Sequence, residues 1–177
     1  MQTLIGAALL TRIALVGLQA GAPAGLTFTA PAAWHARPAA SSMRVAEFVV
    51  PKAASDPEDA EVIVYFFGVT LGSVDSNVDR WIGQMQQPDG SASKDKARRE
   101  AQTIHGLKVT TVDLAGTYVA EVRPGATERY NKPNFRLRAA VIDTPRGAYY
   151  IKMTGPAKTM AAADADFKAF LGSVRYP

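Results

Sequence analysis

The chain has 177 residues, and 47% of them are hydrophobic, which is enough for one globular domain with an apolar core. Cysteine is absent, so disulfides, thiolate nucleophiles and cysteine-ligated metal sites are excluded. The net charge of +4 weakly favours an acidic partner and is too small to imply nucleic acid.

The N-terminal 20 residues resemble a secretory signal peptide. Two apolar runs, 4–10 and 13–18, flank Arg12, and small residues around Ala20 suit a signal peptidase. The apolar stretch is too broken for a stable transmembrane span. We therefore predict a signal peptide at residues 1–20, one globular domain at residues 21–177, and export to the periplasm or the extracellular space. An uncleaved anchor and a misplaced start codon are the alternatives.

The first part of the domain has the composition of strands joined by turns. Leu26–Pro31 is predicted to form a short strand that ends at the proline, and Met43–Val50 a second one. The polar segment 52–60 contains three carboxylates but lacks the glycine and the closing glutamate of a calcium loop. We interpret it as a solvated turn, with its carboxylates at Asp56, Glu58 and Asp59.

A buried strand followed by an amphipathic helix forms the centre of the chain. Val62–Phe67 is an unbroken apolar run, which predicts a strand covered on both faces. Gly68–Ser73 lacks the lysine of a phosphate-binding loop, so we interpret it as a tight turn. Ser73 is expected to cap a helix. That helix has one apolar stripe at helical spacing, formed by Val74, Val78, Trp81, Ile82 and Met85.

The next segments alternate between charged loops and strands. Asp89–Glu100 is predicted to be a charged loop, and Ala101–Leu114 two strands separated near His105-Gly106. Gly116–Asn134 is long and irregular, which is typical of functional or mobile loops.

A β-hairpin is the clearest local prediction. Thr144-Pro-Arg-Gly147 suits a type I turn between strands at Phe135–Asp143 and Ala148–Thr154. This turn places Ala139 opposite Lys152, so the lysine falls on an apolar strand face. We expect its ammonium group to extend along that face to water. An anion site at this lysine is the alternative.

The remaining pattern completes the predicted fold. Apolar residues recur at helical spacing from Thr159, the expected cap, to Arg175. The order of elements predicts an α+β fold in which two amphipathic helices cover a mostly antiparallel sheet. Because the central strand is apolar on both faces, we expect an α/β/α sandwich.

Six motifs in this chain resemble those of exported bacterial proteins of unestablished function. They are Phe28–Trp34, Phe67-Gly68, Asn77–Trp81, Gly106–Val109, Lys152–Pro156 and Phe167–Leu171. Across residues 25–175 the layout is similar to the PsbP-like fold, which the extrinsic P subunit of photosystem II shares with a Ran-binding nuclear import factor. The resemblance implies a binding or assembly module, and it carries over no functional residue.

No motif in the chain predicts a catalytic, cofactor or metal site. His35 and His105 lack the paired spacing of zinc ligands, and the nucleophile motif Gly-x-Ser-x-Gly is absent. Asp164 and Asp166 lie two residues apart on a predicted helix and point away from each other.

Three functions remain open. The leading hypothesis is a non-catalytic exported binding or assembly module. The second is a small-molecule carrier with its ligand between helix and sheet, near Trp34, Trp81 or Lys152. The third is a hydrolase that uses His35 or His105.

Basic residues are the candidate contacts for a partner. They cluster in two segments that would form one surface if the charged loop folds beside the hairpin's open end. Such a surface would attract an acidic protein or an anionic component of the cell envelope. Two unrelated solvated segments are the alternative. The candidate residues are Lys94, Lys96, Arg98, Arg99, Arg136 and Arg138.

Overall fold

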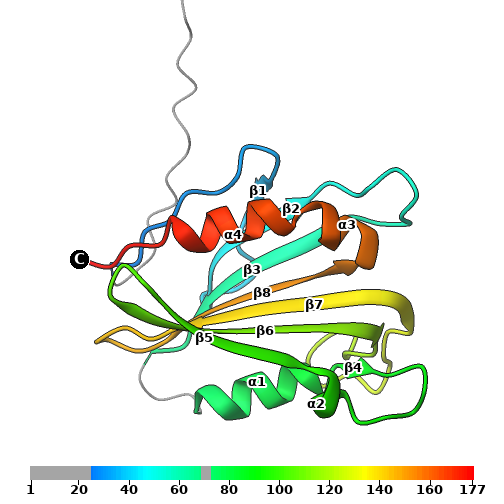
Figure 1. The fold of residues 1–177 in the computed structure, drawn as a ribbon. Coiled ribbons are helices and arrows are strands. Elements are labelled where there is room, and N and C mark those ends of the chain that lie inside the picture. The colour runs from blue at the N-terminus through cyan, green and yellow to red at the C-terminus, as the bar shows by residue number, and fades with distance from the viewer. Residues whose placement is uncertain (1–24, 69–72) are drawn as a thin grey trace, which may run out of the picture.

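The computed structural model describes residues 25–68 and 73–177, in which one antiparallel sheet separates two layers of helices (Figure 1). The predicted signal peptide and most of the predicted turn at Gly68–Ser73 lie outside the described residues. The strands are β1 (His35–Arg37), β2 (Arg44–Val50), β3 (Ala60–Phe66), β4 (Met85–Gln86), β5 (Arg98–Ile104), β6 (Leu107–Tyr118), β7 (Lys132–Ile142) and β8 (Tyr149–Pro156). The helices are α1 (Val74–Ile82), α2 (Ser93–Lys96), α3 (Ala157–Ala162) and α4 (Asp164–Gly172).

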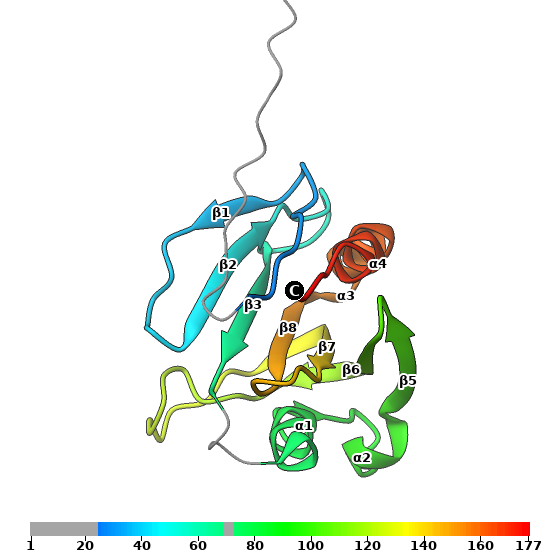
Figure 2. The same ribbon diagram turned by 90° about the vertical axis from the view of Figure 1, so that its left-hand side faces the viewer.

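The strands lie side by side in the order β1-β2-β3-β8-β7-β6-β4, and β5 pairs with the other part of the β6 edge. All strand pairs in the described residues are antiparallel. Figure 2 shows the strong twist that separates β1 and β2 from β5 and β6. The α+β class and the antiparallel sheet expected from the sequence are confirmed.

The predicted hairpin register is also confirmed. Ala139 of β7 pairs with Lys152 of β8, and the Gly147 amide donates to the Thr144 carbonyl at 3.1 Å. The length of the turn sets this register. A shift by one residue would move every side chain of β8 to the opposite face of the sheet. Lys152 therefore lies on the same face as the buried Tyr150.

Each face of the sheet has its own apolar core. On one face, α3 and α4 cover Val62 and Val64 of β3, with Phe170 at the centre of an aromatic cluster. On the other face, α1 packs Trp81 at 2% exposure against Tyr150, with an edge-to-face ring distance of 6.0 Å. The expected α/β/α sandwich is the result.

The central helix begins as its sequence predicts. The Ser73 hydroxyl accepts from the Ser76 amide at 3.1 Å and so satisfies a free N–H of the first turn. The helix ends at Ile82, and Met85 at the end of the predicted stripe belongs to β4.

Two expectations near the chain's first strands and last helix are wrong. Leu26–Pro31 forms a single bridge, Thr27 with Arg175, while the first strand is β1. β1 is exposed throughout, so it has no apolar alternation to recognise. Thr159 does not cap the last helix. Instead Asp56 accepts from its amide at 2.7 Å and from its hydroxyl at 2.6 Å.

Two predicted segments are divided differently in the structure. The single C-terminal helix is two helices that meet at Ala163. The charged loop at Asp89–Glu100 contains α2 and the start of β5, whose residues are almost all exposed. Within the described residues, no helix is both long and apolar enough to cross a membrane.

Candidate functional site

A cleft of about 340 Å³ opens on the face of the sheet that α1 covers only in part. Six of the eight strands contribute to its lining, and charged and hydroxyl groups predominate among the side chains. We call this site the polar cleft. Its lining residues are Arg37, Val49, Glu58, Asp59, Ala60, Glu61, Tyr118, Tyr130, Lys132, Phe135 and Thr154.

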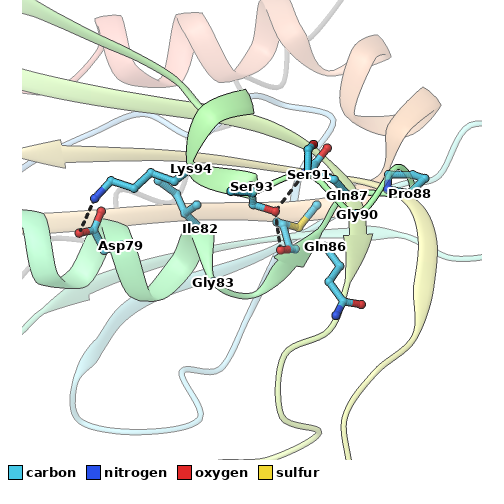
Figure 3. Close-up of a pocket in the computed structure, with 12 residues that line it drawn as sticks. Asp79, Ile82, Gly83, Gln86, Gln87, Pro88, Gly90, Ser91, Ser93 and Lys94 are labelled. Carbon is cyan, nitrogen blue, oxygen red and sulfur yellow. Dashed lines mark hydrogen bonds and ion pairs between the residues drawn. The ribbon is translucent and has the colours of Figure 1, made fainter.

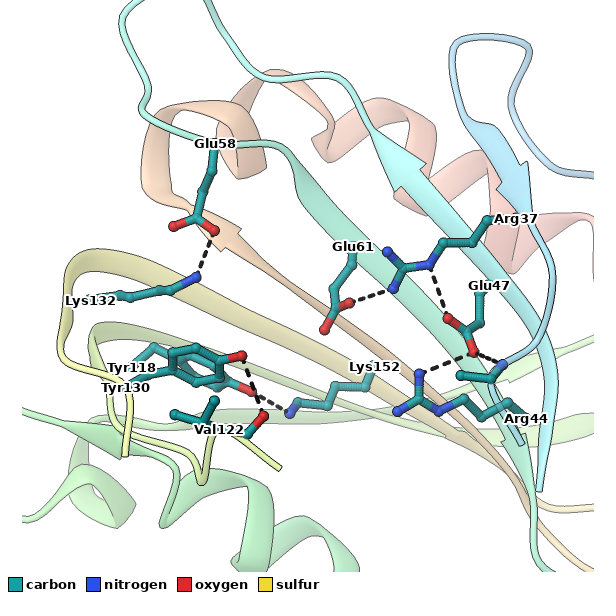
Figure 4. Close-up of polar contacts among 11 residues, drawn as sticks. Arg37, Arg44, Glu47, Glu58, Glu61, Tyr118, Val122, Tyr130, Lys132 and Lys152 are labelled. Atoms are coloured by element: carbon teal, nitrogen blue, oxygen red, sulfur yellow. Dashed lines mark hydrogen bonds and ion pairs between the residues drawn. The ribbon is translucent and has the colours of Figure 1, made fainter. Parts of the chain in front are cut away.

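One wall of the polar cleft contains Arg37 of β1, which is held by charged residues behind the wall. Glu47 is 2% exposed and accepts from Arg37 Nε at 3.0 Å, from Arg44 Nη1 at 3.0 Å and from the Ala40 amide at 2.6 Å. Burial alone would raise the pKa of Glu47, but these hydrogen bonds outweigh it and lower the pKa. The same Arg37 guanidinium also donates to Glu61 at 2.7 Å. The wall is therefore held in one conformation (Figure 4).

The opposite wall is aromatic. The ring of Tyr118 stacks on Tyr130 at 5.8 Å and on Phe135 at 6.0 Å between centroids. Lys132 places its ammonium group 4.6 Å from the centre of the Tyr130 ring and binds Glu58 at 2.6 Å. This ion pair fixes the outer edge of the wall, as Figure 4 shows.

Lys152 lies next to the polar cleft, where its side chain contacts the hydroxyl of Tyr118, a residue that lines the cleft. Its Nζ donates to Gln84 Oε1 at 2.6 Å and to the Tyr118 hydroxyl at 3.2 Å, and the residue is 8% exposed. The expectation that the ammonium group reaches water is wrong, because it is buried against Gln84, which follows α1, and Tyr118 of β6. Burial lowers the pKa of Lys152 to about 8, although the charge of Glu61 opposes the shift. In the described residues, no carboxylate oxygen lies within 4.0 Å of this Nζ.

A second, more open groove of about 680 Å³ lies between the end of α1, β4 and α2 (Figure 3). Its polar groups mostly bind one another. Ser93 donates to the Met85 carbonyl at 2.7 Å, Gln87 donates to Ser93 at 3.1 Å, and Lys94 binds Asp79 at 3.5 Å. Because this groove is more open and fewer charged side chains line it, we regard the polar cleft as the candidate site.

The six predicted basic residues fall into two groups. Arg98, Arg136 and Arg138 lie on the α4 face of the sheet. Both arginines of β7 bind Asp164, at 3.0 Å and 2.7 Å, and also contact Asp113, the residue paired with Arg98 in the sheet.

The other group, Lys94, Lys96 and Arg99, lies on the other side and binds Asp79, Asp89 and Asp75. Arg98 binds Glu100 at 3.1 Å, so each of the six is ion-paired. The capture of an anionic partner stays a prediction.

Other residues singled out in the sequence have identified partners or surroundings. Trp34 and Trp81 are buried in the two cores. His105 lies 3.0 Å from the Gly172 carbonyl through Nε2, and His35 is exposed on β1. No catalytic site is evident in the part of the chain that the structure describes, and no three potential metal ligands cluster there.

Several residues that line the polar cleft or lie next to it are absent from the sequence-based prediction. Tyr118 and Tyr130 fall in the segment predicted to be irregular, and Gln84 has no distinguishing pattern. Glu47 carries a usable signal, since a single carboxylate inside the apolar strand Arg44–Val50 must find cationic partners when it is buried.

The fold has counterparts among solved structures. CyanoP, the cyanobacterial PsbP of Synechocystis sp. PCC 6803, aligns with a TM-score of 0.52 and 13% identity over 95% of this chain and 99% of its own. LpqN of Mycobacterium tuberculosis, described as involved in cell envelope biogenesis, aligns with a TM-score of 0.54 and 11% identity over 89% and 87%. No family model and no curated protein sequence matches the chain. At these identities the likeness concerns the fold alone, and the chain has the PsbP-like fold.

Proposed function

We propose that the protein is an exported, non-catalytic binding module that holds a small polar ligand in the polar cleft. One observation carries this proposal. Residues of six strands, most of them with charged or hydroxyl side chains, converge on a single cleft of about 340 Å³. Ligand sites are concave, occupy roughly 300–1,000 Å³ and contain a few placed polar groups.

The cleft is a better ligand site than the interior beneath the helices. Trp34 and Trp81 are 6% and 2% exposed, and both rings are packed against other aromatic rings. A ligand beneath the helices would have to displace these contacts. Of the three places considered for a carrier, the surroundings of Lys152 adjoin the polar cleft.

The walls of the cleft are organised before a ligand binds. Arg37 is fixed by two carboxylates and Lys132 by one. Side chains already held in place lose less conformational entropy on binding, which increases affinity. This arrangement supports recognition of a particular ligand.

Export is part of the proposal. It is supported by the signal-like pattern of residues 1–20, and the likeness to LpqN, whose description places it in envelope biogenesis, is compatible with it. Mass spectrometry of the protein from its own host should find an N-terminus near Gly21. An intact chain in the cytosol would contradict export.

The test of binding uses a substitution that fills the cleft. Val49 of β2 is half-buried in its lining, and Val49→Trp places an indole in the open volume while keeping a residue type that suits a strand. Thr103→Trp on the exposed strand β5 is the matched control. Both proteins and the wild type are screened by thermal shift against small polar compounds from the host's envelope.

The expected result is a compound that stabilises the wild type and Thr103→Trp but not Val49→Trp. Equal stabilisation of all three proteins would place the ligand elsewhere. If no compound stabilises the wild type and a protein partner is captured equally by all three, an assembly module that docks by another surface replaces this proposal.

A further inference from the structure

We infer that the ligand of the polar cleft carries a carboxylate, and that this group binds the ammonium of Lys152. The inference rests on the proposed function and specifies the chemical class of its ligand. The observation that carries it is a cation buried next to the cleft whose hydrogen-bond partners, Gln84 and Tyr118, are both neutral.

An ammonium group has three N–H donors, and two of those on Lys152 have acceptors in the described residues. The buried charge itself is not neutralised by a direct ion pair there. Buried charges in proteins are normally paired, because an unpaired one costs several kcal/mol. An anionic ligand would supply the third acceptor and the counter-charge together.

The cleft gives a ligand a route to this group. Thr154, which lines the cleft, follows Lys152 by two residues on the same face of β8, a distance of about 7 Å along a strand. Tyr118 also lines the cleft, and its hydroxyl contacts Nζ directly. A carboxylate beside this hydroxyl would reach the ammonium from the cleft.

The charges around Lys152 come from three elements. Glu61 of β3 favours the protonated lysine, while Arg44 of β2 and Arg80 of α1 disfavour it. Glu61 is already held by Arg37. Burial raises the pKa of Tyr118, so its hydroxyl stays neutral. Arg44 is paired with the buried Glu47, and Arg80 is exposed. Lys152 is therefore the buried charge of this region that lacks a direct ion pair in the described residues, and it favours an anion.

A singly charged group fits better than a doubly charged one. Glu61 lies close enough to influence Lys152, and it would repel a phosphate dianion more strongly than a carboxylate. A monoanion neutralises the single ammonium and leaves no excess charge in a partly buried site. This argument selects a carboxylate as the ligand group.

The experiment uses matched pairs of small probes on the purified full chain. Lactate is compared with lactamide and glucuronate with glucose, and inorganic phosphate serves as the dianion. Binding is followed by NMR titration of the backbone amides. Lys152→Met removes the ammonium, and Lys168→Met, at an exposed position of α4, is the control.

The expected result is saturable binding of the carboxylates, weaker binding of their neutral partners, and loss of the difference in Lys152→Met alone. Because only the ammonium form binds, affinity in the wild type should fall roughly 30-fold between pH 7 and pH 9.5. Saturating lactate should also raise the NMR-measured pKa of Lys152 in the wild type, which keeps the test valid if Lys152→Met does not fold.

Other outcomes overturn the inference without deciding the proposed function. Equal binding of glucose and glucuronate, or a Lys152 pKa unchanged by lactate, would show that the ligand group does not reach the ammonium. Phosphate binding more tightly than the carboxylates would overturn the choice of a monoanion. The proposed function fails separately, if filling the cleft with Val49→Trp leaves binding of the envelope compound intact.

Discussion

Arg37 of the edge strand β1 binds Glu61 of β3 across the intervening strand, with 2.7 Å between Nη2 and Oε2. The Nε atom of the same guanidinium donates to Glu47 of β2, the strand between them, at 3.0 Å. One guanidinium therefore joins three neighbouring strands on the cleft side of the sheet. Since β1 has only three residues and pairs with β2 alone, this contact holds the edge of the sheet and the wall of the cleft together.

Replacing the buried carboxylate at the centre of this arrangement should be costly. Glu47→Gln leaves Arg37 and Arg44 without their shared charge partner, and we expect a loss of about 3 kcal/mol in the free energy of unfolding. The exposed pair of Arg98 and Glu100 is the control, and Glu100→Gln should cost under about 0.5 kcal/mol. Urea denaturation measures both.

Glu47 also predicts part of the acid sensitivity. Its pKa is lower in the folded protein than in the unfolded chain. Its contribution to stability is therefore present in full above the unfolded pKa and is lost as the pH falls through the folded pKa. The slope of stability against pH below about 4.5 should be smaller in Glu47→Gln. Identical slopes in the two proteins would contradict this.

Lys152→Met should stabilise the protein at neutral pH. The folded pKa of about 8 lies below the value of 10.5 for a free lysine, so folding favours the neutral amine. The resulting cost is present in full below pH 8 and disappears as the pH rises through the unfolded pKa. Allowing for two lost hydrogen bonds, we expect a net gain of roughly 1–3 kcal/mol at pH 7. Thermal unfolding should show this gain vanish by about pH 10.5; a variant less stable than the wild type at pH 7 would contradict the charge argument.

Trp81 and Arg80 test the orientation of α1. Trp81 is 2% exposed and Arg80 is exposed, although its guanidinium lies 6.0 Å from the centre of the Trp81 ring. Trp81→Ala should cost about 3–5 kcal/mol by chemical denaturation. Arg80→Ala should cost under about 0.5 kcal/mol. Similar losses at both positions would show that the apolar stripe does not carry the packing.

Capture of an acidic protein or an anionic envelope component by the basic residues remains a prediction. Lys94 and Lys96 are exposed, as are Arg98 and Arg99. Arg136 and Arg138 are less exposed, and each contacts both Asp113 and Asp164. Replacing Lys94 and Lys96 by serine should reduce capture at low salt and leave stability almost unchanged. A pull-down at low and high salt measures this. If capture changes neither with salt concentration nor with the substitutions, an electrostatic binding surface at these residues is excluded.

Local patterns in the sequence predict the parts of the fold that one turn or one stripe determines. The turn Thr144–Gly147 fixes the register that places Ala139 beside Lys152, and the stripe through Trp81 fixes the buried face of α1. In both cases the information lies within one hairpin or one helix. Neither prediction depends on how distant segments meet.

The features that the sequence does not predict depend on contacts between segments that are distant in the chain. β1 and β5 are exposed strands, so they have no apolar alternation, and their existence depends on pairing with β2 and β6. The buried state of Lys152 depends on Gln84, 68 residues away, and on Tyr118, 34 residues away. The hairpin indicates the face on which this lysine lies, but not what covers it.

The pairing of β3 with β8 has a consequence for the order in which the chain can fold. Residues 61–66 find their second sheet partner at residues 149–154, and the core around Val62 and Val64 is completed by the helices after β8. During synthesis the N-terminal part of the chain leaves the ribosome first. The apolar side of β2 and β3 would then stay uncovered until nearly the whole chain has been made. Because contacts so distant in sequence form slowly, we expect the early part to stay unfolded through synthesis. If the protein is exported through a channel that admits only extended chains, it would not have to be unfolded first.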